Sequence, residues 1–508
     1  MQNLKEFANS DAIVSADEMH AIELNAYSMG ISALQLMENA GCAVASFVRE
    51  NFKSKNILLF CGPGNNGGDG FVVARMLSKD YNVKVIIVGE KVKGGPSLSN
   101  FTAISSSPFV DINYYAELDK EELEGLANWS DVIIDAIFGT GFKGELKGIF
   151  KDAVRLINSS GKKVVAIDVP SGFGEDCKLC VKADYTITFH KIKEGMEKLR
   201  NVVVKEIGIP LDAELIAGPG DVYLASKSIS PFATKHDRGM LLIIGGSKVY
   251  HGAPISSLLS ASAIGALRAG AGYALLYVPR SILNSVRSLS QNQIVKPLGD
   301  DYISFTNEIK KEIDKAQAVV IGMGITKEKP AQQACTKIVE YALSKGKKVV
   351  VDADGISAVA RIKNKNSKNL LITPHDGEFY RFSGIKLEHE SNENLPERIS
   401  LAIKIAKEKG INVLLKGHNT IITDGTHVKV NMAKSANLST MGTGDVLAGI
   451  IGGFAALGAG LFEAAAAGSY IHSKASELLK IEKGNHIIAF DLIEVLPKIL
   501  MEFDKVLQ

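Results

Sequence analysis

Short apolar runs alternate with helix-like stretches along nearly the whole chain. Runs of this length, bounded by polar turns, suit strands that are buried on both faces of a parallel sheet. Strands alternating with helices predict an α/β fold with helices on both faces of each sheet. The expected strands are Asn56–Cys61, Val83–Val88, Asp131–Ile137, Lys163–Val169, Tyr185–Phe189, Val202–Ile207, Leu241–Ile244, Tyr273–Val278, Ala318–Ile321, Lys348–Val351, Leu370–Ile372 and Val413–Leu415. The expected helices include one opened by a capping box at Ser15 and Glu18, then Phe71–Leu77, Phe150–Ile157 and Pro254–Ala269.

The chain is long enough for more than one domain. It has 508 residues, and at roughly 150 residues per domain this predicts two to four globular units. Between Gly208 and Lys235 the composition changes, with Pro210, a Gly-Pro-Gly at 218–220 and several serines. We therefore place a boundary in this segment and expect two domains, 1–215 and 222–508.

Composition excludes several classes of protein. The 58 Lys and Arg against 56 Asp and Glu leave a net charge of +2, too balanced for a chain that mainly binds nucleic acid or an anionic membrane. Five cysteines, including a lone C-x-x-C at Cys177 and Cys180, favour a reducing compartment and no disulfide framework. The uncharged stretch Val446–Phe462 is rich in glycine, which predicts two buried helices and a turn instead of a membrane span. The first 14 residues lack a secretory signal, so we expect a cytoplasmic protein.

A glycine-rich loop follows the first expected strand. Residues 62–70 read Gly-Pro-Gly-Asn-Asn-Gly-Gly-Asp-Gly, and we expect the next helix to begin near Phe71. Bare backbone N–H groups at a helix start suit an anionic ligand. The alternative is an ordinary glycine-rich connection.

Polar side chains follow two further strands of the same half. Asp135 and Asp168 end two strands, and Ser171 follows three residues after Asp168. Ligands of open parallel sheets bind beyond the carboxyl ends of strands. Asn66, Asp135 and Ser171 offer only oxygen ligands of the kind that K⁺ or Mg²⁺ prefers over zinc. The alternative is that each aspartate merely caps a helix.

Four motifs of this half, taken in order, resemble the NAD(P)H-hydrate epimerase domain over about residues 10 to 212. They are Leu36–Gly41, Asn65–Gly70, Asp135–Gly141 and Asp168–Gly172. The resemblance implies that K⁺ is held by Asn66, Asp135 and Ser171. It also implies that the hydrated dinucleotide is bound by Asn65, Asn66, Gly67, Gly68, Asp69, Gly139, Thr140, Gly141, Phe142, Lys143, Gly144, Glu145 and Asp168. Asp168 is the candidate general acid/base. One departure is His190–Lys193, which stands where a turn containing Gly and Pro is expected.

The second half contains Met441-Gly442-Thr443-Gly444-Asp445 at the start of an apolar helix. A Gly-x-Gly loop entering a helix makes an anion hole, and Asp445 stands where a phosphoryl group meets an acceptor hydroxyl. The arrangement is that of ribokinase-like small-molecule kinases, and no P-loop sequence occurs. The alternative is an aspartate that only caps a buried helix.

Further motifs of this half are Gly245–Ser247, Gly252–Pro254, Gly322–Gly324, Asp352–Gly355, Thr373–Glu378 and Lys416–Thr420. Together, from about residue 222 to 505, they resemble the ADP-dependent NAD(P)H-hydrate dehydratase domain, which has a ribokinase-like αβα fold. The resemblance implies that Ala253, Gly324, His375 and Asp445 contact the hydrated dinucleotide. It implies that ADP is bound by Lys416, Gly417, His418, Asn419, Thr420, Gly442, Thr443 and Gly444, with Mg²⁺ on its phosphates. Met323, Thr326 and the segment Asn437–Thr440 depart from the family pattern. Without the resemblance, His375 reads as a hydrogen-bonded residue at a strand end.

Taken together, the sequence predicts an α/β protein with a Rossmann-like three-layer αβα domain followed by a ribokinase-like αβα domain. We expect the first to interconvert the R and S hydrates of NADH and NADPH, and the second to return the S form to NAD(P)H at the expense of ADP, with Asp445 as base. The alternative is a ribokinase-like hydroxyl kinase whose N-terminal domain only senses nucleotides or serves as a scaffold. The partners expected are nucleotides and, by resemblance, further copies of the chain.

Overall fold

The computed structural model describes residues 2–8, 13–174, 178–250, 253–289, 292–362, 367–388, 391, 394–432 and 436–504. The side chains of residues 253–258, 260 and 261 also lie outside this description, as does Cys177. The chain forms two compact units, one of residues 10–210 and one of residues 211–508 together with residues 1–9. The N-terminal segment belongs to the second unit because Leu4 and Phe7 pack against its core.

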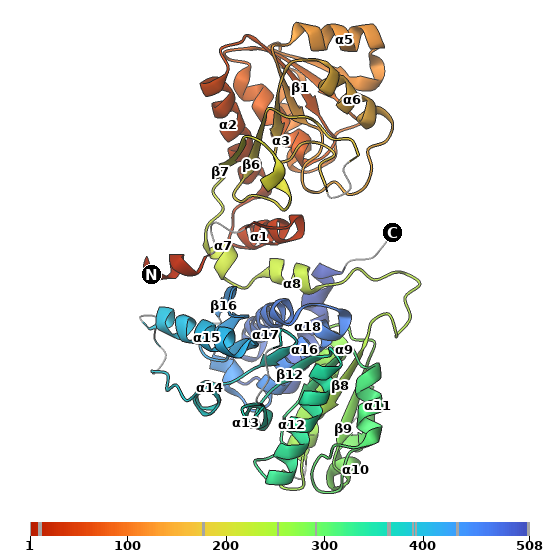
Figure 1. Cartoon of the computed structure of the whole chain (residues 1–508), viewed down its shortest axis with the longest axis vertical. Helices are drawn as coiled ribbons and strands as arrows, with labels where there is room; N and C mark the ends of the chain where they lie inside the picture. Colours follow the sequence, from red (N-terminus) through yellow and green to blue (C-terminus); the bar gives the residue numbers. More distant parts are fainter. Residues whose placement is uncertain are drawn as a thin grey trace. The chain divides into compact units, whose positions relative to one another are not determined.

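The first unit is a parallel sheet with helices on both faces (Figure 1). Its strands are β1 (Asn56–Cys61), β2 (Asn82–Ile87), β3 (Val110–Tyr114), β4 (Val132–Ala136), β5 (Lys163–Ile167), β6 (Tyr185–Phe189) and β7 (Val202–Lys205). Its helices are α1 (Ala16–Ser28), α2 (Ala33–Asn51), α3 (Asn65–Leu77), α4 (Pro96–Ser105), α5 (Lys120–Trp129) and α6 (Gly148–Ser159). The strand order is β3-β2-β1-β4-β5-β6-β7, and every pairing is parallel. The order reverses between β1 and β4, where a sheet of this kind leaves a crevice for ligands.

The second unit is a mixed sheet of nine strands, also covered on both faces. Its strands are β8 (Met240–Ile244), β9 (Tyr273–Val278), β10 (Ile294–Pro297), β11 (Ala318–Ile321), β12 (Lys348–Val351), β13 (Leu370–Ile372), β14 (Asn412–Leu415), β15 (Asn419–Thr423) and β16 (Val428–Met432). Its helices are α7 (Asp212–Leu215), α8 (Pro219–Ala225), α9 (Ala253–Arg268), α10 (Arg280–Ser288), α11 (Asn307–Lys315), α12 (Lys329–Ser344), α13 (Asp354–Val359), α14 (Asp376–Ser383), α15 (Leu395–Lys409), α16 (Thr443–Leu457), α17 (Leu461–Lys483) and α18 (Ala489–Leu500). The order is β10-β9-β8-β11-β12-β13-β14-β15-β16, and only the last two strands run antiparallel to their neighbours.

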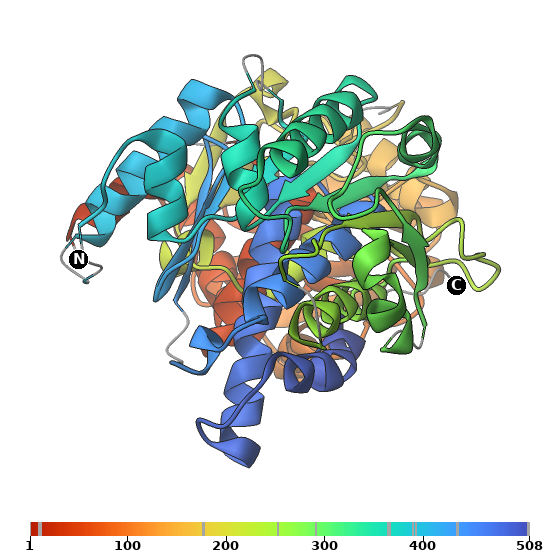
Figure 2. The same ribbon diagram turned by 90° about the horizontal axis from the view of Figure 1, so that it is seen from below.

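Side chains of β8 show how this sheet divides its core between two faces. Leu241 and Ile243 contact the cluster that includes α9, α16, α17 and α18, whereas Leu242 and Ile244 contact the cluster of α11 to α15. Figure 2 shows these two groups of helices on opposite sides of the strands. Every second side chain of a strand points to the same face, so a run that is apolar throughout serves both clusters.

The α/β class expected from the sequence is confirmed, as are the capping box at Ser15 and the long helix after β8. Residues 446–462 form α16, a turn and the start of α17, as expected. Within the described ranges, no helix is both long and apolar enough to cross a membrane. Gly449 explains the glycine content of α16, because a Cβ there would lie 2.1 Å from the carbonyl oxygen of Ser262 on α9.

Two expectations about local structure were wrong. Helix α3 begins at Asn65 and not near Phe71, so the polar part of the glycine-rich loop is itself the first turn of the helix. Strands β3, β10, β15 and β16 were not expected. Glycine lowers intrinsic helix propensity, but close packing requires it in α3: a Cβ on Gly67 would lie 1.9 Å from the carbonyl oxygen of Gly62.

Candidate functional site

The carboxyl ends of β1, β4 and β5 form the rim of the first unit. Phe60 pairs with Asp135, and Asp135 pairs with Ala166, so the loops after these three strands lie next to one another. Helix α3 starts at the same rim with Gly64 as its N-cap, and no side chain caps its free N–H groups. The rim therefore combines a helix N-terminus with the carboxylates that follow β4 and β5.

Asp135 and Ser171 form a fully buried pair at this rim. Ser171 donates from its Oγ to Asp135 Oδ1 at 2.6 Å and from its N–H to Oδ2 at 2.7 Å. The N–H of Phe138 donates in turn to Ser171 Oγ at 2.8 Å. Burial raises the pKa of Asp135 to about 6, against the opposing effect of the hydrogen bonds from Ser171 and Ile137. Removing a carboxylate from water without a countercharge disfavours its ionised form.

The amide of Asn66 is buried in the first turn of α3. Neither its nitrogen nor its oxygen has a hydrogen-bond partner among the residues that the structure describes. An unsatisfied buried amide is costly, and a bound cation or ligand would relieve that cost. In the same part of the chain, no three His, Cys, Asp or Glu side chains gather as a metal cluster would require. Asn66, Asp135 and Ser171 offer oxygen donors, the type of ligand that a hard cation prefers.

Asp168 directly follows β5 and has a left-handed backbone conformation, with φ of 65°. Its Oδ2 accepts from the N–H of Thr140 at 3.0 Å, and its Oδ1 lies 3.0 Å from the Nζ of Lys193. A Cβ on Gly139 would lie 2.8 Å from Asp168 Oδ2 and 3.5 Å from the Asn66 amide, so only glycine lets these groups approach. Burial raises the pKa of Asp168, but Lys193 and the Thr140 amide outweigh burial and hold that pKa below its ordinary value.

The pKa of Asp69, another carboxyl group of this rim, is shifted in the opposite direction to that of Asp168. The pKa of Asp69 is raised well above its ordinary value by burial and by the charges of Asp168 and Glu23, while Lys193 opposes the rise. The pKa values of Asp168 and Asp69 are thus shifted in opposite directions. Two carboxyl groups whose surroundings push their pKa values apart can act as base and acid.

The other expected residues of this rim have different surroundings. Gly68 serves packing, because a Cβ there would lie 2.6 Å from Met37 Sδ of α2. Lys143 and Glu145 make surface ion pairs with Asp17 and Lys178. The ring of Phe142 stacks on that of Phe138 with centroids 4.4 Å apart. The structure therefore gathers Asn66, Asp69, Gly139, Thr140 and Asp168, whereas Lys143 and Glu145 point to surface partners.

In the second unit, α16 opens directly from the glycine loop. Its N-cap is Gly442 with φ of 93°, and Thr443 is its first residue. Thr443 Oγ1 donates to the carbonyl oxygens of Leu438 and Thr440 at 2.7 and 2.9 Å, which fixes the loop before the helix. His472 Nε2 lies 2.9 Å from the carbonyl oxygen of Thr443. Burial lowers the pKa of His472 to about 4, so the neutral ring donates from Nε2 and supports the helix start.

Asp445 lies in the first turn of α16. Burial and the like charge of Asp352 raise its pKa to about 7, although Lys416 opposes the rise. A carboxyl with a pKa near neutrality is suited to accept a proton at physiological pH.

Lys416 and Asp352 form an ion pair beside Asp445. Lys416 Nζ lies 2.8 Å from Asp352 Oδ1, which also accepts from Thr373 Oγ1 at 2.7 Å. A Cβ on Gly444 would lie 3.5 Å from Lys416 Nζ, so the ammonium group faces the anion hole. Burial lowers the pKa of Lys416, but Asp352, Glu378 and Asp445 raise it above its ordinary value overall. The site therefore places the protonated ammonium group of Lys416 beside the free N–H groups at the start of α16, an arrangement that suits a phosphate.

The other expected residues of this site are more varied. His375 is the N-cap of α14, where its Nδ1 accepts from the N–H of Gly377 at 3.0 Å, as a hydrogen-bonded strand-end residue would. Asn419 and Thr420 belong to β15 and not to a loop. Thr326 has a φ of 71° at the position where the family pattern has glycine, a conformation that costs a non-glycine residue about 1 kcal/mol. Gly324 has a φ of 65°, and Ala253 begins α9, its side chain being outside the described part.

Some residues of both sites were missed by the sequence analysis. Lys193 was noticed only as part of an unusual stretch, and Asp352 and His472 were given no role. Lys193 and His472 act through partners far away in the chain, whereas Asp352 directly follows β12, the same local signal that indicated Asp168.

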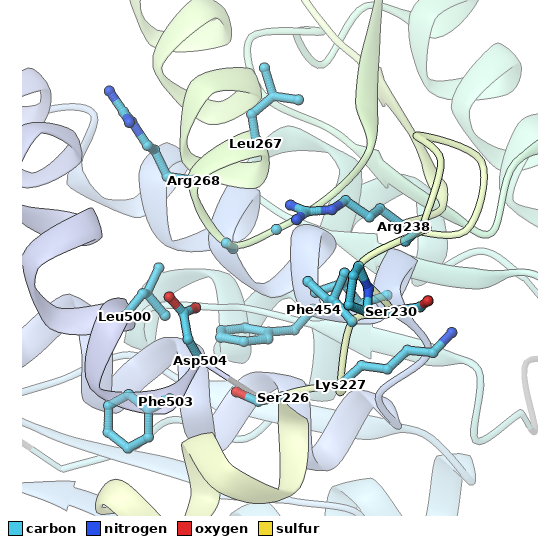
Figure 3. Close-up of a pocket in the computed structure, with 16 residues that line it drawn as sticks. Ser226, Lys227, Ser230, Arg238, Leu267, Arg268, Phe454, Leu500, Phe503 and Asp504 are labelled. Atoms are coloured by element: carbon cyan, nitrogen blue, oxygen red, sulfur yellow. The ribbon is translucent and has the colours of Figure 1, made fainter. Parts of the chain in front are cut away.

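A pocket of about 420 Å³ lies elsewhere in the second unit (Figure 3). Leu267 and Arg268 at the end of α9 line it together with Phe454 and Leu457 at the end of α16. Asp445 lies at the opposite end of α16, which spans about 22 Å for its 15 residues. The pocket is therefore separate from the anion hole.

Comparisons with known proteins bear on both units. A family model described as NAD(P)H-hydrate dehydratase matches residues 241–498, and one described as YjeF-related protein N-terminus matches residues 33–195. A bifunctional NAD(P)H-hydrate repair enzyme of Methanothermobacter thermautotrophicus is 34% identical over 97% of this chain and 96% of its own length. One from Pyrobaculum aerophilum is 35% identical over 96% of this chain and 98% of its own.

Solved structures were also compared. An ADP/ATP-dependent NAD(P)H-hydrate dehydratase from Bacillus subtilis, co-crystallised with ATP and Mg²⁺, is 22% identical with a TM-score of 0.48, covering 57% of this chain and 99% of its own. A ribokinase-like superfamily protein from Enterococcus faecalis is 20% identical with a TM-score of 0.48, covering 56% of this chain and 95% of its own.

Fold and site together define a two-unit α/β enzyme. One unit has a rim lined by carboxylates, and the other has a glycine loop at a helix start beside Asp445, whose pKa is raised. The matches extend over nearly the whole chain and include both units. The chain belongs to the family of bifunctional NAD(P)H-hydrate repair enzymes.

Proposed function

We propose that the first unit interconverts the C6 epimers of hydrated NADH and NADPH with Asp168 as base, and that the second dehydrates the S epimer using ADP. Membership of the family supplies the two activities, epimerase and dehydratase. The position of Asp445 supports the assignment of the second step more than any other observation. Asp445, whose pKa is about 7, lies at the start of α16 beside the Lys416–Asp352 ion pair.

Dehydration in the second unit needs a better leaving group than hydroxide. Asp445 takes the proton of the C6 hydroxyl. The hydroxyl oxygen then bonds to the β-phosphorus of ADP, and AMP leaves. The ring nitrogen's electron pair then expels phosphate as the C6–O bond breaks, and loss of a proton from C5 restores the dihydropyridine. The N–H groups of Gly442 to Gly444 and the Lys416 ammonium stabilise the charge on the transferring group. Mg²⁺ with the nucleotide would add positive charge at the phosphates.

Epimerisation in the first unit needs a proton to be given to the hydroxyl that leaves C6 and a proton to be taken from the water that adds to C6. Asp69, whose pKa is raised, is suited to protonate the departing C6 hydroxyl, which leaves as water while the ring nitrogen forms a double bond to C6. Ionised Asp168 is suited to take the proton of the water that adds to the other face. Asn66, Asp135 and Ser171 would hold K⁺, which would supply positive charge near these carboxylates.

The proposal is tested by recovery of the dihydronicotinamide absorption band from mixed R and S NADH hydrate with Mg²⁺ and K⁺. Full recovery with ADP is expected, together with AMP and phosphate in equal amounts. Parallel reactions with ATP, and with Na⁺ in place of K⁺, test the nucleotide and the cation. No recovery with either nucleotide would overturn the proposal, and phosphorylation of an alcohol would then identify a hydroxyl kinase. The expected homo-oligomer rests on family resemblance, and sedimentation of the full chain would test it.

Asp352→Asn is expected to shift the acid limb of the dehydration rate to lower pH, by on the order of one unit. Burial and the like charge of Asp352 together raise the pKa of Asp445 to about 7, so removing the charge of Asp352 lets Asp445 stay ionised at lower pH. The measurement is kcat against pH at saturating ADP. Asp354→Asn is the matched control, because Asp354 accepts from the Thr326 N–H and does not contribute to the shift of Asp445. An acid limb that stays in place or moves to higher pH would contradict the prediction.

A further inference from the structure

Lys193 is a buried lysine within the stretch His190–Lys193 that departs from the family pattern. Its side chain is 5% exposed, and its Nζ lies 3.0 Å from Asp168 Oδ1. The same Nζ donates to Thr188 Oγ1 and to the carbonyl oxygen of Phe189, each at 2.8 Å. An ammonium group has three donors, and all three are used. Three acceptors around a buried ammonium group fix the position of that group.

The backbone that carries Lys193 is anchored on both sides. The N–H of Val14 donates to the carbonyl oxygen of Ile192 at 3.0 Å, and that of Glu194 donates to Val14 at 3.0 Å. Two acceptors of the ammonium belong to β6, the strand next to β5, which Asp168 directly follows. The ammonium is thus held by the sheet itself and not by a free surface loop.

The two carboxylate oxygens of Asp168 have different partners, Lys193 for one and the Thr140 amide for the other. Oδ1 faces Lys193 and Thr188, and Oδ2 faces the N–H of Thr140. Asp168 has a left-handed backbone conformation, a strained state that persists only where surrounding contacts impose it. Burial, Asp168 and Glu23 on α1 raise the pKa of Asp69 on α3, and Asp69 in turn contributes to the raised pKa of Tyr27 on α1.

We propose that Lys193 is a positioning residue of the epimerase site, which holds the Asp168 carboxylate in place as the base of the reaction. This inference rests on the proposed epimerase function. Lys193 has no free donor for substrate, so it acts through Asp168. Its loss would leave a buried carboxylate with no countercharge, which favours the protonated, inactive form.

The test is the rate of interconversion of separated R and S hydrates by the full chain, without ADP and at saturating K⁺, as a function of pH. The acid limb of the Lys193→Met rate is expected to lie at higher pH than that of wild type, because the Asp168 carboxylate loses the charge that lowers its pKa. Between the two acid limbs the variant is expected to lose at least about tenfold in kcat, with little change in KM. Lys193→Arg keeps the charge and should restore the wild-type acid limb.

Lys191→Met is the matched control, because Lys191 is buried to the same extent in the same turn. It should leave the pH profile unchanged. Lys193→Gln, which keeps donors but no charge, serves if the methionine variant does not fold, and it should show the same shifted limb. An unshifted limb in the uncharged variants, or an equal shift in Lys193→Arg, overturns the inference. Full activity of Asp168→Asn would instead remove the base assignment on which the inference rests.

Discussion

The Asp445→Asn variant is expected to lose ADP-dependent dehydration, with kcat lower by about 10² to 10⁴. Asparagine keeps the shape of the side chain but accepts no proton, so the C6 hydroxyl is no longer activated for attack on ADP. The first turn of α16 remains intact, because Thr443, not Asp445, makes the contacts to Leu438 and Thr440. Recovery of the absorption band from pure S hydrate with ADP and Mg²⁺ measures the loss.

The wild-type profile should agree with this role. The pKa of Asp445 is about 7, and the ionised form is the base, so the rate should rise through neutrality and fall at lower pH. Asp424→Asn is the matched control, because Asp424 is a carboxylate of the same unit that only fixes the turn before β16. Its rate should stay within twofold of wild type. A rate for Asp445→Asn close to that of wild type would place the base elsewhere.

Asp168→Asn is expected to stop epimerisation, again with a loss of about 10² to 10⁴ in kcat. With the mixed hydrates and ADP, the variant should recover the absorption band only up to the S fraction, because the R epimer no longer feeds the second step. Wild type should recover the whole band. Dehydration of pure S hydrate should be unchanged, since that chemistry belongs to the other unit.

The asparagine leaves the Lys193 ammonium without its charged partner, so folding needs its own control. The double variant Asp168→Asn, Lys193→Met removes both charges and should be as inactive as the single variant, with a normal melting temperature. Complete recovery of the mixed hydrates by either variant would show that Asp168 is not the base. If wild type itself stops at the S fraction, the first unit is a nucleotide-sensing or scaffold module.

Much of the architecture follows from local sequence. Apolar runs such as Leu241–Ile244 have apolar side chains on both faces of the strand, so both faces of the sheet must be covered by helices. The start of α3 was misplaced at Phe71 because Gly67 and Gly68 weaken helix propensity, and only their contacts with Gly62 and Met37 show why they are there. Edge strands such as β3 and β16 carry partly exposed residues, and their apolar signal is correspondingly weak.

The sequence by itself determined the α/β class and the candidate residues that follow each strand, since strand ends and glycine loops are local patterns. Only the tertiary structure decided how these residues act. Lys193 lowers the pKa of Asp168, and burial together with Asp352 raises the pKa of Asp445 to about 7. Both effects come from burial and from charges brought together by the sheet. Electrostatic coupling depends on distance in space, which sequence separation does not reveal.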